Sequence, residues 1–273
     1  MYAAFHTVGL PGRTLTDVVG AVKRAGYAGI ELNAETLPWA DAHITPDTSP
    51  QERTNVLKAI RSADLKVAAV GAHIPMLHPD AQRRRAAIDF VKGCSQLAVE
   101  MDTRYIHILS GPLAASTSEE VAWRWFAEAV AEVVEHALSL EVDVGIEAIA
   151  GHLFHSADDY AQLAADLPGV PFKVNFDPSQ IAVQGANPLE IVNRFGDRIA
   201  HVHMKDGAGH FPDFSFPPLG RGGIDFDALV AGLRGIGYGG ALSVEYEAQV
   251  YGFQLSEQQI LDESRAFLAR FDV

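Results

Sequence analysis

The sequence predicts a single (β/α)8 barrel, the TIM-barrel fold, over residues 1–273, and three observations lead to this prediction. First, short apolar and β-branched runs alternate eight times with amphipathic stretches along the chain. Strict alternation implies parallel strands, and eight units is the number that closes a barrel. Second, the composition does not change along the chain, which favours one domain. Third, no glycine-rich phosphate fingerprint follows the first strand, which weakens the rival open, doubly wound sheet.

Each expected strand is a short run of apolar or β-branched residues, a composition typical of buried strands. The eight strands are expected at residues 2–8, 29–33, 66–74, 105–111, 142–149, 172–177, 199–206 and 241–247. Because all eight are expected to be parallel, their carboxyl ends should open on one face of the barrel. Active sites of this fold lie on that face.

Local start and stop signals place the helices between these strands. Thr14, with Asp17 three residues later, resembles a capping box at the start of the first helix, and Gly26 ends that helix. Ser156 starts the fifth helix and is followed by two acidic residues in the first turn, where negative charge is favourable. The other helices are expected at residues 50–63, 80–99, 118–140, 188–195, 225–236 and 256–271, with a long Gly- and Pro-rich loop before residue 225.

Composition and charge argue against several classes of function. With 48% hydrophobic and 21% charged residues, the chain has the composition of a soluble globular protein with a large core. It contains no run of 18 apolar residues, and its first residues do not resemble a signal peptide, so we expect a cytoplasmic protein that binds no membrane. The single cysteine, Cys94, excludes an intramolecular disulfide and fits a reducing compartment. A formal charge of −14 argues against nucleic acid as a partner.

Four of the expected strands carry one acidic or histidine side chain near their carboxyl ends. These residues are Glu147 in GIEAI, Asp177 in FKVNFD, His203 in IAHVHMKD and Glu245 in ALSVEYE. Strand interiors do not normally carry carboxylates, because burial of an unpaired charge is costly. Four such residues at the same relative place, on strands whose ends converge, indicate a shared divalent cation. His201 and Glu247 compete with their neighbours for this role, since residues two apart on a strand point the same way.

These residues lie in motifs that resemble those of the xylose isomerase-like barrels. The motifs are GIE around Glu147, NFDPSQ around Asp177, HVHMKD around His203, LGRGGID at 219–225 and SVEYE around Glu245. The resemblance covers essentially the whole chain, and it is to the branch of sugar isomerases and epimerases that includes the ketose 3-epimerases and inosose dehydratases. It implies one xylose isomerase-like TIM barrel domain over residues 1–273.

The resemblance also implies roles for individual residues. The metal ligands that it implies are Glu147, Asp177, His203 and Glu245, in preference to His201 and Glu247. Glu147 and Glu245 match the two glutamates that also transfer the proton in the 3-epimerases. His201 is left as a buried group or a residue that supports the ligands.

Two features depart from the pattern of the family. Gln180 stands where relatives often have a histidine three residues after the aspartate, as in DPSH. A glutamine can hydrogen-bond a hydroxyl but is a poor metal ligand, so we expect one metal ion rather than several. The loop after His203 also lacks the arginine typical of the 3-epimerases, which leaves the identity of the sugar open.

Six polar residues at strand ends or in the following loops are candidates for contact with the substrate. They are Glu31, His73, His107, His152, Gln180 and Lys205. Each has a structural alternative: a histidine at a strand end is as often a satisfied buried group, and Glu31 could pair with a basic side chain. Lys205 could hold a hydroxyl or enolate oxygen, or form a salt bridge with Asp206 or another acid.

One imidazole and three carboxylates suit Mn²⁺, with Mg²⁺ or Co²⁺ as alternatives. We therefore expect a metal-dependent sugar isomerase or epimerase of carbohydrate metabolism that acts on a keto sugar or a related polyol ketone. The reaction would pass through a metal-stabilised enediolate, with Glu147 and Glu245 as acid and base.

Other functions remain as alternatives. The first is a lyase that uses the same site for inosose-type dehydration or for β-elimination from a 3-keto-glycoside. The others are a metal-binding, sugar-binding protein without turnover and a nuclease of the endonuclease IV type, which the acidic composition disfavours. The resemblance also allows a homo-oligomer, since barrels of this family often pair.

Overall fold

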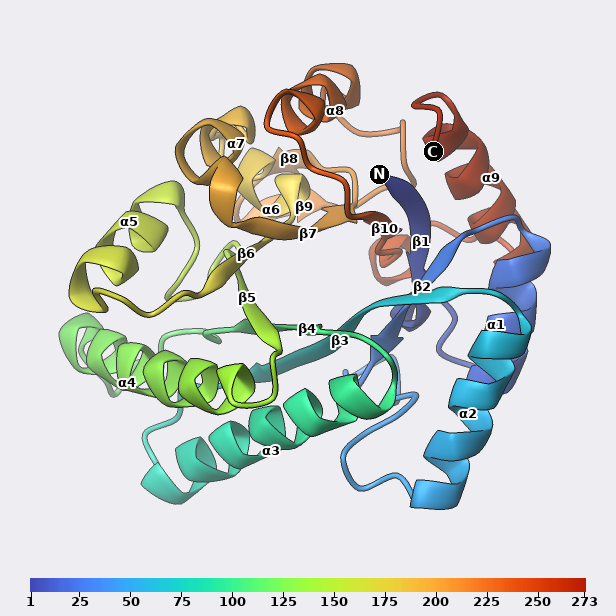
Figure 1. Ribbon diagram of the computed structural model, residues 1–273. Coiled ribbons are helices and arrows are strands. Elements are labelled where there is room, and N and C mark those ends of the chain that lie inside the picture. Colours follow the sequence, from blue (N-terminus) through green and yellow to red (C-terminus); the bar gives the residue numbers. More distant parts are fainter.

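Eight parallel strands form a closed barrel in the computed structural model, which describes residues 1–273 (Figure 1). The strands are β1 (Tyr2–His6), β2 (Gly29–Asn33), β3 (Lys66–Pro75), β4 (Tyr105–Leu109), β5 (Asp143–Glu147), β6 (Lys173–Phe176), β7 (Ile199–Met204) and β10 (Ala241–Val244). Their order around the ring is β1–β10–β7–β6–β5–β4–β3–β2, and every neighbouring pair is parallel. The predicted TIM barrel is confirmed.

Helices surround the ring on its outer side (Figure 1). They are α1 (Leu15–Arg24), α2 (Pro50–Ser62), α3 (Ala81–Glu100), α4 (Glu119–Leu138), α5 (Ala157–Asp166), α6 (Pro178–Ala182), α7 (Leu189–Phe195), α8 (Phe226–Gly235) and α9 (Glu257–Ala269), with 3-10 turns η1 (Thr7–Gly9), η2 (Gly196–Arg198) and η3 (Ala248–Tyr251). All the predicted helices are present, and their ends agree with the prediction to within about two residues.

Side-chain caps explain why the helices begin where they do. The backbone N–H of Asp17 donates to Thr14 Oγ1 at 3.3 Å, as the sequence predicted. At α5 the cap is complete, because Ser156 and Asp159 satisfy each other's backbone N–H groups. Gly26, with φ of +84°, follows α1 in the left-handed conformation that favours glycine.

Two elements were absent from the prediction. The segment between β7 and α8, predicted as a loop, contains the antiparallel hairpin of β8 (Ala208–His210) and β9 (Asp213–Ser215). The short helix α6 follows β6 directly, and Asp177 caps it. Neither element is long enough to show a periodic pattern of apolar residues, which is the signal on which the prediction depends.

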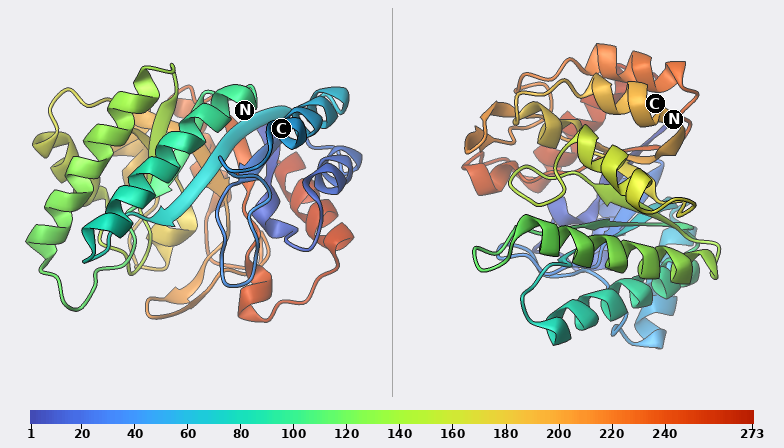
Figure 2. Two further views of the ribbon diagram at one scale, coloured as in Figure 1. Left: turned by 90° about the horizontal axis from the view of Figure 1, so that it is seen from below. Right: turned by 90° about the vertical axis from the view of Figure 1, so that its left-hand side faces the viewer.

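The carboxyl ends of the strands open toward the hairpin. Both chain termini lie together at one end of the barrel, where β1 begins, while β8 and β9 lie at the other end (Figure 2). Asp206 fixes the loop beyond the hairpin, because the backbone N–H groups of Gly220 and Gly222 each donate to its Oδ2 at 2.9 Å. The loops of this end therefore form the region in which a site is expected.

The apolar core is continuous but does not fill the whole barrel. A single cluster of 66 buried apolar residues joins the helices to the sheet, which is the core of one domain. Toward the carboxyl ends, by contrast, the interior is polar. It contains the buried side chains of His6, Glu31, His107, His201 and His203.

Gly145 of the GIE motif is required by packing. A Cβ atom at this position would lie 1.7 Å from Tyr105 Oη, so only glycine leaves room for the tyrosine inside the barrel.

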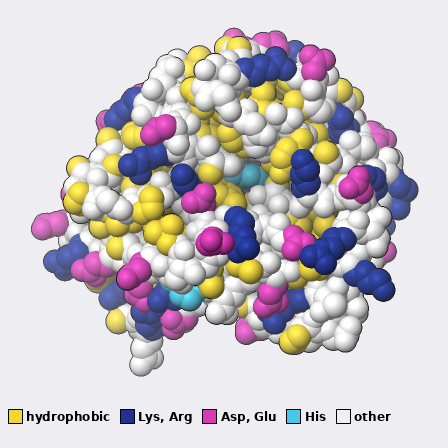
Figure 3. Space-filling view, viewed as in Figure 1, with side chains coloured by type: hydrophobic (Ala, Val, Ile, Leu, Met, Phe, Trp, Pro, Cys, Tyr) yellow, Lys and Arg dark blue, Asp and Glu magenta, His cyan; other side chains and the backbone are white.

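The outer surface is mixed in charge, and positive and negative side chains are interspersed on the face seen in Figure 3. None of the helices combines the length and apolar composition that a membrane span needs.

Candidate metal centre

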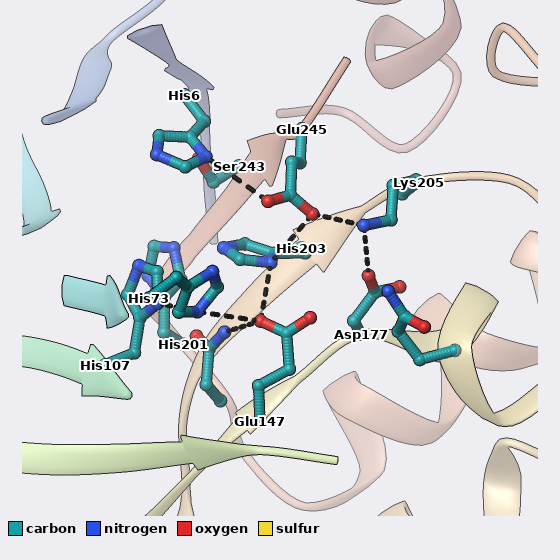
Figure 4. A network of polar contacts seen from close by, with 12 residues as sticks. His6, His73, His107, Glu147, Asp177, His201, His203, Lys205, Ser243 and Glu245 are labelled. Atoms are coloured by element: carbon teal, nitrogen blue, oxygen red, sulfur yellow. Dashed lines mark hydrogen bonds and ion pairs between the residues drawn. The ribbon is translucent and has the colours of Figure 1, made fainter. Parts of the chain in front are cut away.

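Four side chains from four different strand ends converge at the carboxyl end of the barrel (Figure 4). Glu147 is the last residue of β5, Asp177 follows β6, His203 is in β7 and Glu245 follows β10. Each offers one ligand atom, and these atoms all lie within 4.8 Å of one another. All four residues are buried. The structure thus brings together the four residues predicted to share a cation.

His203 is held so that one ring nitrogen faces the carboxylates. Its Nε2 lies 3.0 Å from Glu31 Oε1, and its Nδ1 lies 3.2 Å from Glu147 Oε2 and 3.3 Å from Glu245 Oε2. Nδ1 has no hydrogen-bond partner of acceptable geometry, although it is buried. A histidine that donates through Nε2 carries its lone pair on Nδ1, which is the tautomer that a metal ligand needs.

Asp177 likewise keeps one oxygen free of hydrogen bonds. Its Oδ1 accepts from the backbone N–H and the hydroxyl of Ser179, at 2.8 and 2.7 Å. Its buried Oδ2 has no hydrogen bond, although Lys205 Nζ lies 2.9 Å away in an ion pair. Unpaired buried polar atoms are rare, so these two atoms, His203 Nδ1 and Asp177 Oδ2, need an explanation. With three carboxylates and one imidazole converging there, the residues fit a divalent cation.

Lys205 is the ammonium group of this cluster. Its Nζ lies 2.5 Å from Glu245 Oε2 and 3.1 Å from Glu247 Oε2, in addition to the contact with Asp177. Burial lowers the pKa of Lys205, but Asp177 and Glu245 raise it more, so it stays well above its ordinary value. The predicted alternative of a salt bridge to Asp206 is wrong, because Asp206 caps the neighbouring loop. The other alternative, a salt bridge with another acid, is confirmed, because Lys205 pairs with Asp177, Glu245 and Glu247.

The pKa values of the two glutamates are both held low. Burial raises the pKa of Glu147, but His73 and His203 lower it more, and the net result is well below the ordinary value. Burial also raises the pKa of Glu245, but His203 and Lys205 lower it more, to well below the ordinary value. For Asp177, burial raises the pKa to about 6, with Glu147 and Glu245 adding to that effect and Lys205 opposing it. Mutual repulsion between these carboxylates is what a dication would relieve.

A second polar layer lies beneath the four ligands, and Glu31 is its centre. One oxygen of Glu31 contacts His107 Nε2 at 2.6 Å as well as His203, and the other contacts His201 Nε2 and Ser243 Oγ at 2.8 and 2.5 Å. Glu31 and His107 are fully buried in the middles of β2 and β4. Both side chains point into the barrel below the ligands and are already paired within the protein, and their contact with substrate remains a prediction. His201 is buried in the same layer, as predicted.

The other predicted contact residues lie nearer the ligands. His73 Nε2 is 3.2 Å from Glu147 Oε2 and also contacts His107 Nδ1. His152, in the loop after β5, has an unpartnered buried Nδ1, and burial lowers its pKa to about 4 despite the opposing effect of Glu147. The side chain of Gln180 is buried, and the backbone N–H of Ala150 donates to its Oε1 at 3.2 Å, so it also fixes the loop that carries His152. Contact of these three residues with substrate remains a prediction.

The prediction missed several residues of the site. Asn175 Nδ2 donates to Glu147 Oε2 at 2.6 Å, and His6 Nδ1 lies 3.5 Å from Glu245 Oε1. Glu35, just after β2, is buried with its carboxyl 3.8 Å from His73 Nδ1. Asn175 and Glu35 carried the same signal that identified the ligands, namely a polar residue at or just past the end of an apolar strand.

Comparisons with known proteins agree with the barrel fold. A model of the family described as xylose isomerase-like TIM barrel matches residues 19–271. Fructoselysine 3-epimerase of Escherichia coli O157:H7 is 25% identical over 197 residues, which is 71% of each chain. Inosose dehydratase of Lacticaseibacillus casei is 31% identical over 116 residues, covering 34% of this chain and 38% of that protein. The solved structure of a D-tagatose 3-epimerase-like protein is similar in fold, with a TM-score of 0.81, 19% identity, and coverage of 99% and 97%.

Proposed function

This chain belongs to the xylose isomerase-like TIM barrel family, and from that membership we propose that it is a divalent-metal-dependent sugar epimerase or isomerase. Its substrate would be a keto sugar or a related polyol ketone. The observation that carries the proposal is the convergence of Glu147, Asp177, His203 and Glu245, whose ligand atoms lie within 4.8 Å of one another. The fructoselysine 3-epimerase relative, matched over 71% of its length, supports the reaction class.

Those four residues would hold the cation, with Mn²⁺ favoured over Mg²⁺ or Co²⁺. A bound dication polarises the substrate carbonyl and stabilises the negative charge that develops when the neighbouring carbon loses a proton. His203 Nδ1 and Asp177 Oδ2 support this assignment, because both are buried and neither makes a hydrogen bond within the protein.

Glu147 and Glu245 would move the proton. They come from β5 and from the end of β10, which are separated by β6 and β7 in the ring, so they approach a shared point from different sides. One carboxylate would remove the proton from the carbon beside the carbonyl, and the opposite glutamate, after taking up a proton from solvent, would deliver it to the other face. This exchange inverts the carbon and is epimerisation.

Each of the two glutamates has a donor that orients it. Asn175 Nδ2 donates to Glu147 Oε2, and Lys205 Nζ donates to Glu245 Oε2, at 2.6 and 2.5 Å. A carboxylate that is already oriented needs less reorganisation when the substrate binds, and this favours proton transfer. The ammonium of Lys205 would also stabilise the deprotonated form of Glu245 more strongly than the neutral amide stabilises Glu147.

The test is solvent exchange. The protein, freed of metal with a chelator and reloaded with Mn²⁺, Mg²⁺ or Co²⁺, is incubated in D₂O with a panel of keto sugars and inososes. We expect NMR to show loss of one C–H signal beside a carbonyl, with the metal-free protein inactive and activity restored on reloading. Absence of exchange with every metal and every sugar would count against the proposal.

A lyase using the same site is the second candidate, and the inosose dehydratase relative is the observation that favours it. Removal of the same proton, followed by loss of a β-hydroxyl, would give dehydration in place of epimerisation. A new ultraviolet absorption from an enone, with no epimer formed, would decide for the lyase. Recovery of an epimer without that absorption would decide for the epimerase.

A further inference from the structure

We infer that the carboxyl group of Glu35 contacts the bound sugar and, with Glu247, restricts the site to keto sugars that carry no phosphate or carboxylate. The group that Glu35 binds would be a hydrogen-bond donor, either a hydroxyl or an ammonium. This inference rests on the proposed function, because it names the class of sugar that the same centre would accept.

Glu35 is held in place by its own loop. It lies two residues beyond the end of β2, and the side chain of Asn33 forms hydrogen bonds with both its backbone N–H and its backbone carbonyl group. Asn33 Nδ2 donates to the carbonyl of Glu35 at 3.0 Å, and the N–H of Glu35 donates to Asn33 Oδ1 at 3.2 Å. The side chain of Glu35 is only 5% exposed. A carboxyl group is thus fixed beside the centre and does not extend into solvent.

The carboxyl group of Glu35 makes no hydrogen bond within the protein. Its nearest cationic partner is His73, whose Nδ1 lies 3.8 Å from Glu35 Oε1, beyond hydrogen-bond distance. The other ring nitrogen of His73 lies 3.2 Å from Glu147 Oε2, so one imidazole ring separates Glu35 from the metal centre. The side chain keeps a small exposed area, so a hydroxyl of the substrate could replace water as the hydrogen-bond partner of this carboxyl group. Burial, together with the nearby Glu245, Glu247 and Glu147, raises the pKa of Glu35 to about 8, consistent with a carboxyl group among other acids.

The charges around the centre are unbalanced. Five carboxylates lie there, those of Glu35, Glu147, Asp177, Glu245 and Glu247, and Lys205 is the one lysine or arginine that pairs with any of them. Three of the five already contact the Lys205 ammonium. These acids share one ammonium group, and none of them is paired with a second lysine or with an arginine. A phosphate or carboxylate on the substrate would find no free cation and would be repelled.

The experiment uses three sugars that share one carbon frame: D-fructose, 1-amino-1-deoxy-D-fructose and D-fructose 6-phosphate. For the Mn²⁺-loaded protein, kcat/KM for deuterium exchange is measured with each sugar, and ligand-induced shifts in Tm are measured with D-sorbitol and D-sorbitol 6-phosphate. We expect the phosphate to be disfavoured by at least about tenfold relative to the uncharged sugar, and the amine to be accepted at least as well as the uncharged sugar.

The variant Glu35→Gln should raise KM for D-fructose about tenfold with little change in kcat, because the contact between the carboxyl group and a sugar hydroxyl is lost. It should also reduce the discrimination against the phosphate, while manganese content stays unchanged. Glu190→Gln is the matched control, since it removes one exposed carboxylate of α7 far from the centre and should change neither quantity.

The outcomes separate this inference from the proposed function. Exchange on both D-fructose and its 6-phosphate at equal rates, or a Glu35→Gln variant identical to Glu190→Gln, would overturn the inference and leave the epimerase proposal standing. If no sugar exchanges, the proposed function fails, and the sorbitol pair still decides whether the site rejects phosphate. Equal Tm shifts with the two alcohols, or no shift with either, would also overturn the inference.

Discussion

His203 Nε2 lies 3.0 Å from Glu31 Oε1, so a residue of β2 determines which ring nitrogen of a β7 histidine faces the metal centre. Glu31 is fully buried and is shared among three histidines and Ser243. Although burial raises its pKa, His6 and His201 are foremost among the groups that hold the pKa of Glu31 well below the ordinary value. This carboxylate therefore orients the side chain of His203 toward the candidate metal centre.

Replacement of Glu31 should weaken metal binding although Glu31 lies outside the four proposed ligands. Glu31→Gln places an amide where an acceptor is needed, so we expect a loss of roughly 10- to 100-fold in Mn²⁺ affinity, measured by calorimetric titration. Ser243→Ala is the control, because it removes one donor to Glu31 and leaves the contact with His203 in place. An unchanged affinity in Glu31→Gln would show that the tautomer of His203 is fixed in another way.

The buried ammonium of Lys205 should stabilise the metal-free protein. Lys205→Met leaves Asp177, Glu245 and Glu247 without their shared counter-ion, and breaking a buried pair costs about 3–5 kcal/mol. Urea unfolding at pH 7 with excess chelator would measure this loss. Lys23→Met, which removes an exposed pair with Asp64 at 4.0 Å, should cost less than about 1 kcal/mol.

Glu132, on the outer surface, should stabilise the folded protein to an extent that depends on pH and on salt concentration. Its hydrogen bonds with Arg85 and Lys92 lower its pKa from 4.5 to about 2. Because the folded pKa is the lower one, the stabilisation is present above pH 4.5 and is lost as pH falls from there toward 2. The side chain is 37% exposed, so solvent screening limits the effect to less than about 1 kcal/mol.

The comparison of Glu132→Gln with the original protein tests this linkage. Thermal or urea unfolding at pH 7 should show the variant to be the less stable, with the difference shrinking below pH 4.5 and in high salt. A difference that is constant from pH 7 to pH 2 would mean that packing, and not charge, carries the contact.

Gly145 should not tolerate a side chain. The Cβ of alanine would lie 1.7 Å from Tyr105 Oη and 2.6 Å from Tyr105 Cζ, so Gly145→Ala should cost about 3 kcal/mol or more. The double variant with Tyr105→Leu should recover part of the stability, measured by urea unfolding as a double-mutant cycle. Gly235→Ala is the matched control, because nothing lies within 4 Å of its added Cβ and it ends α8. Additive losses in the cycle would contradict the proposed clash.

Cys94 should be inert in the native protein. It is fully buried in α3, and burial raises the pKa of its thiol. Because the thiolate is the reactive form, we expect Ellman's reagent to label no thiol in native protein and one thiol per chain in urea. Rapid labelling without denaturant would mean that α3 opens on the time scale of the assay.

The sequence by itself determined the barrel and the residue types that meet at the candidate metal centre. The eight alternating segments are confirmed as eight parallel strands. They could be recognised because a buried parallel strand consists of a nearly continuous run of apolar residues. The acids and the histidine near the ends of the last four strands were visible as exceptions to those runs. Since parallel strands of a barrel share one carboxyl face, their convergence could be predicted without coordinates.

Only the tertiary structure decided the depth of each polar residue. Glu31 and His107 looked like strand-end residues, yet they lie a layer below Glu147, because depth depends on how each strand is shifted against its neighbours. That shift includes an irregularity in the β2–β3 register between Ile30 and Glu31, which no local pattern in the sequence reveals. The same long-range geometry placed Lys205 between three carboxylates and Glu35 beside His73. A sequence pattern fixes which face of a strand a side chain takes, whereas its height and its partners depend on chain segments far away.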